Sequence, residues 1–101
     1  MNGEHLHKLT DIDRLVHEPA RLLLLCTLSL VEEADFLFLL RETGLTRGNL
    51  SAHLSKLEAA DLIRIEKGYR GKRPQTICNI TKAGQEALQT HRQLLKQALD
   101  L

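Results

Sequence analysis

Five polar residues between positions 47 and 56 carry side chains suited to contacting phosphates and base edges. They are Arg47, Asn49, Ser51, Ser55 and Lys56. Arginine and lysine bind phosphate or guanine, asparagine pairs with adenine, and serine can donate or accept a hydrogen bond with either partner. Most of the residues on the same helix surface are small, and none is an acid. This pattern favours close approach to a polyanion such as DNA, whereas the plainer alternative is a solvated helix face.

A second basic group lies in the stretch 67–74. Arg70, Lys72 and Arg73 occur there together with two glycines and Pro74. Alternating apolar residues on either side predict short strands at 62–66 and 76–80, so the stretch between them should reverse the chain. The sequence therefore predicts a hairpin with positive charge at its tip. The alternative is a charged turn that only resists aggregation.

The first polar group needs a helix to display it. Thr46 is a good N-cap, and Leu50, Leu54 and Leu57 recur at spacings of four and three, which places them on one side of a helix. We therefore expect a helix over residues 47–58 that buries its leucines and exposes its polar residues.

The elements on either side of this helix define a motif. An apolar helix is expected over residues 34–43, with Glu32 and Glu33 at its start and Gly44 in a left-handed conformation after its end. Two helices joined by so short a turn are typical of a helix-turn-helix. With the basic hairpin directly after it, the pattern predicts a winged helix.

Three further helices complete the expected fold, which is mainly α with a small β-hairpin wing. An N-terminal helix is expected over 9–17, a buried scaffold helix begins at Pro19 and runs to position 29, and Thr81 caps a last helix over 82–99. The whole chain, 1–101, is expected to form a single domain. The two flanking helices carry spare apolar residues, which a symmetric dimer would bury. The predicted dimer-interface residues are Leu9, Ile12, Leu88, Leu95 and Leu99.

Composition and charge exclude several classes of protein. The net charge is +1, yet residues 41–73 hold eight lysines or arginines against four acids, so the middle of the chain is its basic part. The longest apolar run is too short to span a membrane, and no secretory leader precedes the chain, so we expect a cytoplasmic protein with no membrane partner. Ser51 and His53 are only two residues apart on a helix and cannot work as a nucleophile and base, so we expect no enzyme.

The histidines and cysteines suggest structural roles. His53 is expected to be packed and hydrogen-bonded, and His91 to lie at an interface or on the surface. Cys26 and Cys78 are both expected to be buried, free thiols, with Arg64 as a candidate neighbour of Cys78. We expect no metal and no other cofactor. The alternative is a sensor in which Cys26, Cys78 or the histidines bind metal or respond to an oxidant. A small-molecule effector is compatible with the sequence, but no pattern indicates one.

Several runs of the sequence resemble the short winged-helix transcriptional regulators related to the MarR and ArsR groups. The runs are Phe36-Leu37-Phe38-Leu39-Leu40, Gly44-Leu45-Thr46, Asn49-Leu50-Ser51-Ala52-His53-Leu54, Leu57-Glu58, Lys67-Gly68-Tyr69, Gly71-Lys72-Arg73-Pro74 and Ile80-Thr81-Lys82-Ala83-Gly84. The resemblance implies a homodimeric, repressor-type protein that binds double-stranded DNA. It places the helix 47–58 in the major groove and the wing on the backbone or in the adjacent minor groove. The competing hypothesis is a winged-helix module that binds another protein without reading DNA.

Overall fold

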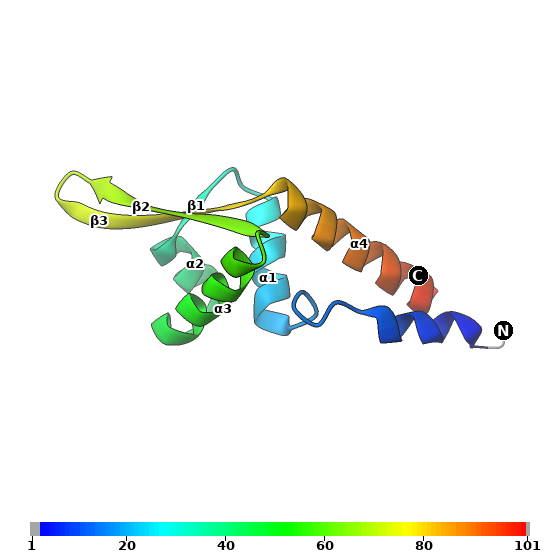
Figure 1. The fold of residues 1–101 in the computed structure, drawn as a ribbon. Helices are drawn as coiled ribbons and strands as arrows, with labels where there is room; N and C mark the ends of the chain where they lie inside the picture. Colours follow the sequence, from blue (N-terminus) through cyan, green and yellow to red (C-terminus); the bar gives the residue numbers. More distant parts are fainter. Residues whose placement is uncertain (1–2, 101) are drawn as a thin grey trace.

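The computed structural model describes residues 3–100, which form a helical core with a long β-hairpin at one end and a pair of helices at the other (Figure 1). In chain order the helical elements are η1 (Glu4–Asp11, a 3-10 helix), α1 (Pro19–Ser29), α2 (Phe36–Thr43), α3 (Arg47–Ala59) and α4 (Lys82–Leu99). The strands are β1 (Ala34–Asp35), β2 (Ile63–Arg70) and β3 (Arg73–Ile80), in the antiparallel order β1-β3-β2. This arrangement confirms the predicted fold class.

The core lies where α1, α2 and α3 meet the inner half of the sheet. Leu24, Leu25 and Leu28 of α1 are fully buried, together with Leu39 of α2 and Leu50 of α3. Burying branched side chains of this kind stabilises a fold by roughly 1.5–3 kcal/mol each. The core therefore fixes the two helices of the helix-turn-helix against α1 and leaves their outer surfaces free.

Local signals in the sequence explain most helix boundaries. Pro19 is the first residue of α1, and the carboxylate of Glu18 accepts hydrogen bonds at its N-terminus. The hydroxyl groups of Thr46 and Thr81 cap α3 and α4, and Gly44 ends α2 with φ 69°. These starts and ends agree with the sequence-based predictions.

The N-terminal prediction was wrong. The helix lies at Glu4–Asp11 rather than at 9–17, and the chain beyond it has no regular structure until Pro19. Side chains replace helical hydrogen bonds in this irregular segment: Asp13 Oδ1 accepts from the Leu15 amide, and Arg21 donates to the carbonyls of Arg14 and Leu15. The first two residues lie outside the described part of the chain.

Three other boundaries also differ from the predictions. Residues 34 and 35 form β1, which pairs with β3, so α2 starts at Phe36 and is capped by Asp35 rather than preceded directly by Glu32 and Glu33. The wing strands reach Arg70 and Arg73, which leaves Gly71 and Lys72 as the whole turn. Because the residues of the outer wing are mostly charged or polar, they show no apolar alternation, and the strands predicted from that alternation were too short.

Candidate nucleic-acid interface

Helix α3 displays all five of its predicted contact residues. Leu50, Leu54 and Leu57 are at most 3 % exposed and hold the helix against the core. The Thr46 hydroxyl caps the helix by accepting a hydrogen bond from the backbone N–H of Asn49 at 3.2 Å. The opposite surface lies open to solvent. The exposed predicted contact residues on α3 are Arg47, Asn49, Ser51, Ser55 and Lys56.

The wing carries the second predicted group to its tip. Arg70 pairs with Arg73 at the last register position, and Gly71 turns the chain with φ 64°, in the left-handed region that glycine adopts freely. Arg70, Lys72 and Arg73 are all exposed. Figure 1 shows the wing projecting from the core on the side that also carries α2 and α3.

A cleft of about 520 Å³ connects the start of α3 to the outer wing. Arg47 lines it from α3, and Arg70 and Arg73 line it from the wing. The carboxylate of Asp35, which caps α2, lines it as well, so three guanidinium groups face one acid. The Arg47 guanidinium carbon lies 5.9 Å from the centre of the Phe36 ring, a cation–π distance that orients the side chain. Three guanidinium groups therefore border one hollow. Arginine pairs with phosphate through two parallel hydrogen bonds, so this cleft is suited to a phosphodiester backbone.

A second hollow of about 630 Å³ separates α3 from the wing strands. Ser51 and Ser55 line it from α3, opposite Lys67 and Thr76 of the wing. Glu58 lines the same hollow. Helix periodicity had assigned this acid neither to the buried side nor to the contact surface, yet it lies beside the predicted contact residues. Because a carboxylate repels phosphate, this end of α3 is the least suited to contact with the DNA backbone.

The remaining predicted contact residues lie outside these two hollows. Asn49 and Lys56 project from the other flank of α3, and Lys72 occupies the wing turn. The candidate interface therefore consists of an arginine cleft, a serine-lined groove and an outer flank of α3 that carries the side-chain amide of Asn49 and the ammonium group of Lys56.

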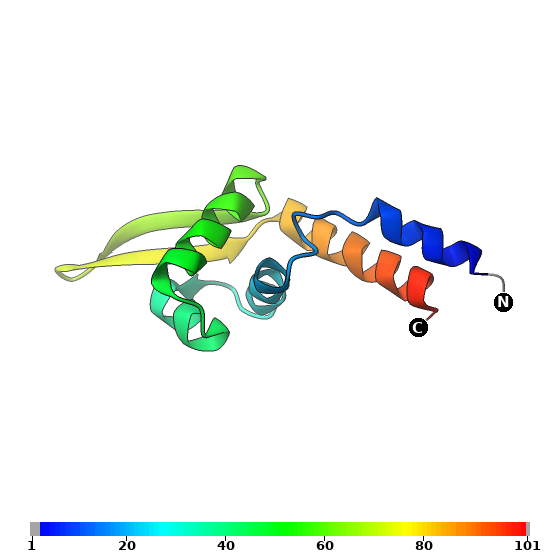
Figure 2. The same cartoon turned by 90° about the horizontal axis from the view of Figure 1, so that it is seen from below.

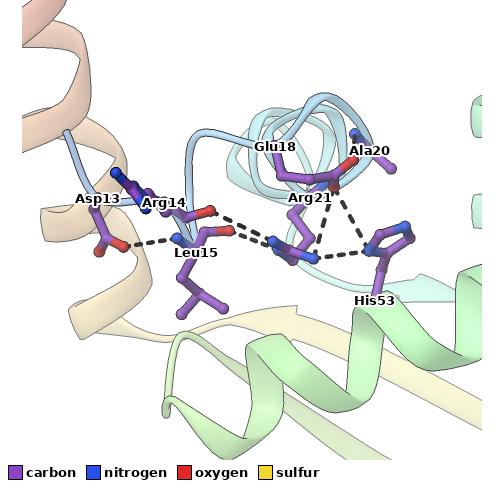
Figure 3. A network of polar contacts seen from close by, with 7 residues as sticks. All are labelled: Asp13, Arg14, Leu15, Glu18, Ala20, Arg21 and His53. Atoms are coloured by element: carbon purple, nitrogen blue, oxygen red, sulfur yellow. Dashed lines mark hydrogen bonds and ion pairs between the residues drawn. The ribbon is translucent and has the colours of Figure 1, made fainter. Parts of the chain in front are cut away.

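Sequence reasoning missed a buried polar network behind α3. Arg21 is the one charged residue of α1 and is only 9 % exposed. Its Nη1 atom donates to His53 Nδ1 at 3.1 Å, and its Nε atom donates to the Leu15 carbonyl at 2.6 Å (Figure 3). The position of an arginine among leucines was the available signal, since a buried charge requires partners.

Glu18 completes this network. Burial raises the pKa of its carboxyl, but the backbone N–H groups of Arg21 and Ala20, with His53 and the Arg21 charge, outweigh burial and leave the pKa below its usual value. The carboxylate lies 3.5 Å from His53 Nδ1. His53 is thus packed and hydrogen-bonded, as predicted.

The other histidine and thiol predictions need correction. His91 is 5 % exposed and its Nε2 atom lies 3.2 Å from His17 Nδ1, so it is an internal residue rather than an interface or surface one. Cys26 is exposed, because it lies on the side of α1 turned away from the core. Cys78 is buried as predicted, although it pairs with Ile65 rather than lying opposite Arg64.

The predicted dimer-interface residues lie on η1 and α4 or just beyond them. Leu9, Ile12, Leu88 and Leu95 are half-buried, and Leu99 is 49 % exposed. η1 packs along α4, and Lys8 donates to Gln97, so the two helices cover part of each other's surface (Figure 2). We call this helix pair the η1–α4 arm.

Residues 3–100 contain neither a metal-binding cluster nor a membrane-spanning helix. Within this range, no group of three or more His, Cys, Asp or Glu side chains is arranged to hold a metal ion. No helix in the same range is both long enough and apolar enough to cross a bilayer.

Comparisons with known proteins identify this architecture. Residues 20–99 match the family model of the winged helix DNA-binding domain. An uncharacterized protein of Methanocaldococcus jannaschii is 31 % identical over 77 % of this chain and 85 % of its own length.

Two solved structures are similar to the chain. A transcriptional regulator homologue of Pyrococcus horikoshii OT3 is 29 % identical with a TM-score of 0.86, over 93 % of this chain and 95 % of its own. Bordetella bronchiseptica BpsR, whose DNA binding is regulated by 6-hydroxynicotinic acid, is 14 % identical with a TM-score of 0.72, over 95 % of this chain and 73 % of its own. The BpsR likeness supports the fold alone.

Proposed function

The chain belongs to the winged helix DNA-binding domain family, and on that premise we propose that it is a homodimeric, repressor-type transcriptional regulator that binds duplex DNA. Helix α3 enters the major groove, and the wing follows the backbone or the adjacent minor groove. The similarity to a P. horikoshii transcriptional regulator homologue supports the regulatory role.

The arginine cleft is the observation that carries the proposal. Arg47 comes from the recognition helix, whereas Arg70 and Arg73 come from the wing, yet all three line the same hollow. A duplex whose phosphates occupied this cleft would bring the outer surface of α3 to the base edges. In this arrangement the arginines position the DNA, while Asn49 on the outer flank reads bases.

The shape of the molecule supports a dimer joined through the η1–α4 arm. The principal extents are 61 × 25 × 21 Å, and the arm points away from the wing. Two copies joined through their arms would present two α3 helices to successive major grooves, about 34 Å apart. We therefore expect a pseudo-palindromic site. No small-molecule effector is part of the proposal, because a neighbour at 14 % identity supports only the fold.

Salt-dependent binding to duplex DNA tests the proposal. The logarithm of affinity should fall with the logarithm of salt concentration, with a slope of about −0.9 for each phosphate contacted. Arg73→Ala should weaken binding to all sequences and reduce that slope by about one, whereas Asn49→Ala should relax preference at particular base pairs with the slope unchanged. Lys82→Ala is the charge-matched control, because Lys82 is exposed at the start of α4.

Two results would contradict the proposal. Absence of binding to both random and selected duplexes at low salt would favour the module that binds a protein partner. Equal effects of Arg73→Ala and Lys82→Ala would show that the arginine cleft is not the binding surface.

A further inference from the structure

We propose that Arg21 is a positioning residue for DNA binding, which holds the recognition helix through a neutral His53 while contacting no DNA itself. The inference rests on the proposed function, because it explains how the DNA-reading surface is kept in place. Residues 12–18, which join η1 to α1, are called the linker below.

Arg21 joins the linker to α3. From α1, its Nε and Nη2 atoms donate to the linker carbonyls of Leu15 and Arg14, at 2.6 and 3.4 Å. Its Nη1 atom donates to His53 Nδ1 on α3 at 3.1 Å and lies 3.9 Å from the Glu18 carboxylate. Figure 3 shows these groups converging on one guanidinium. Because a buried arginine needs its partners, the network is expected to keep this arrangement as long as His53 is neutral.

The chemistry of the contact fixes the protonation of His53. A guanidinium only donates hydrogen bonds, so His53 Nδ1 must accept, and the ring proton must lie on Nε2. A second proton would turn Nδ1 into a donor facing the donors of Arg21. The nearest acceptor would then be Glu18 Oε2, 3.5 Å away. Protonation therefore exchanges the bond to Arg21 for an ion pair with Glu18.

The charged side chains that take part in this exchange lie at the start of α1. Among the described residues, those in contact with His53 are Glu18 at the N-cap of α1 and Arg21 within it. Because the pKa of Glu18 is lowered, its carboxylate stays ionised in mild acid and can receive the imidazolium. Both arrangements are thus available to the same three side chains.

The linker also contacts the η1–α4 arm. His17 Nδ1 lies 3.2 Å from His91 Nε2 on α4, and the His17 amide donates to the Asp13 carbonyl within the linker. The same short segment is therefore tied to α4 by His17 and to α3 by Arg21. In a dimer joined through its arms, loss of the Arg21 contact would remove a polar link between α3 and the part of the molecule that sets the spacing between the two recognition helices, while the core leucines would still hold α3 in the fold.

The sign of the pH effect separates this role from simple charge. Histidine changes charge between about pH 5 and 8, and a histidine that acts only through its charge would strengthen binding to phosphate as pH falls. Positioning by neutral His53 predicts the reverse, namely weaker binding in mild acid. His53→Asn provides the test, because its Oδ1 atom occupies the place of Nδ1 and can accept from Arg21 at any pH.

The experiment measures DNA affinity at about pH 8 and pH 5.5 for the wild type, His53→Asn, His53→Ala and Arg21→Lys. The wild type should bind DNA about tenfold more weakly at the lower pH than at the higher one. His53→Asn should bind as tightly as the wild type at about pH 8, and its affinity should fall at most about twofold in acid. His53→Ala and Arg21→Lys should bind about tenfold more weakly already at pH 8, with an unchanged salt slope because no phosphate contact is lost. His7→Asn, an exposed position on η1, is the matched control and should behave as wild type.

Amide hydrogen exchange of α3 in DNA-free protein gives a second readout. After correction for intrinsic rates, protection of α3 should fall in acid in the wild type but not in His53→Asn. Equal acid effects on the wild type and His53→Asn, in affinity and in exchange, would overturn the inference. If the wild type bound no duplex while the exchange difference was present, the proposed function would fail and the positioning contact would stand.

Discussion

At the scale of single residues, the arginine cleft depends on the geometry of its side chains. The guanidinium groups of Arg47, Arg70 and Arg73 outnumber the one carboxylate in the lining, that of Asp35, so the cleft carries a net positive charge. Lysine would keep the charge but lose the planar group that pairs with phosphate through two bonds. Arginine at all three positions is thus a matter of geometry as well as charge.

The two thiols should differ sharply in reactivity. Burial, aided by the charge of Glu58, raises the pKa of Cys78 to about 11, whereas Cys26 is exposed on α1. Since the thiolate is the reactive form, we expect a disulfide reagent to modify one thiol quickly in native protein and the second only after unfolding. Cys26→Ser should abolish the fast phase. Two fast thiols in native protein would show that Cys78 is accessible.

His91 should make stability depend on pH. Burial, and then the neighbouring His17, lower its pKa from the usual 6.5, despite an opposing effect of Asp13. The unfolded chain therefore takes up this proton at a higher pH than the folded chain, so stability is complete above about pH 6.5 and falls as pH decreases through the lowered value. Thermal melts at a series of pH values should show this loss. The loss should be smaller in His91→Gln, and an identical loss in both proteins would contradict the assignment.

At the scale of elements, the predictable parts of the fold are those governed by local chemistry. Pro19, Thr46 and Thr81 mark helix starts because capping depends on neighbouring residues alone. The linker was mispredicted because Arg21, several residues later, supplies its hydrogen bonds. β1 was missed because a two-residue strand is defined only by its partner.

The candidate site shows the same division between local and distant information. The exposed residues of α3 and the wing could be identified from periodicity and charge. Their arrangement could not, because the cleft between Arg47 and Arg73 depends on how far the wing strands extend. Glu58 and the Arg21 network were missed for the same reason, since the neighbours of each residue come from an element distant in sequence.

The junction between α4 and β2 requires glycine at position 84. A Cβ atom there would overlap the Leu62 carbonyl oxygen and lie 2.7 Å from Ile80 Cγ1, and the backbone oxygen cannot move aside cheaply. Gly84→Ala should therefore lower the free energy of unfolding by about 1–3 kcal/mol. Gly48→Ala is the matched control, because an added Cβ meets nothing within 4 Å and alanine should stabilise α3 by about 1 kcal/mol. Urea unfolding curves of both variants will decide.

At the scale of the whole molecule, the chain is long for its size. The radius of gyration is 15.5 Å, against about 13 Å for a compact domain of this length. The excess comes from the wing and the η1–α4 arm at opposite ends (Figures 1 and 2). Such a shape separates the surface proposed to read DNA from the one proposed to form the dimer, so each can be altered independently.

A charge on the arm should break the dimer while leaving the fold intact. Leu99 is 49 % exposed at the end of α4. Leu99→Glu should convert the proposed dimer to a monomer in sedimentation experiments. It should also weaken DNA binding at least about tenfold, because two linked binding units bind more tightly than one. Leu37→Glu, at a residue 53 % exposed on α2, should leave the oligomeric state unchanged. A wild-type monomer, or an unchanged dimer in Leu99→Glu, would rule out this interface.

The outer half of the wing has no third strand beside it, because β1 pairs with β3 only at Cys78 and Ile77. Two residues could be added to, or removed from, each of the two strands there without disturbing the interior, since side chains on a strand repeat every second position. Each such step would move the tip by about 7 Å along the strand direction. A longer or shorter wing would therefore place its basic tip at a different distance from the core while leaving the proposed recognition helix unchanged.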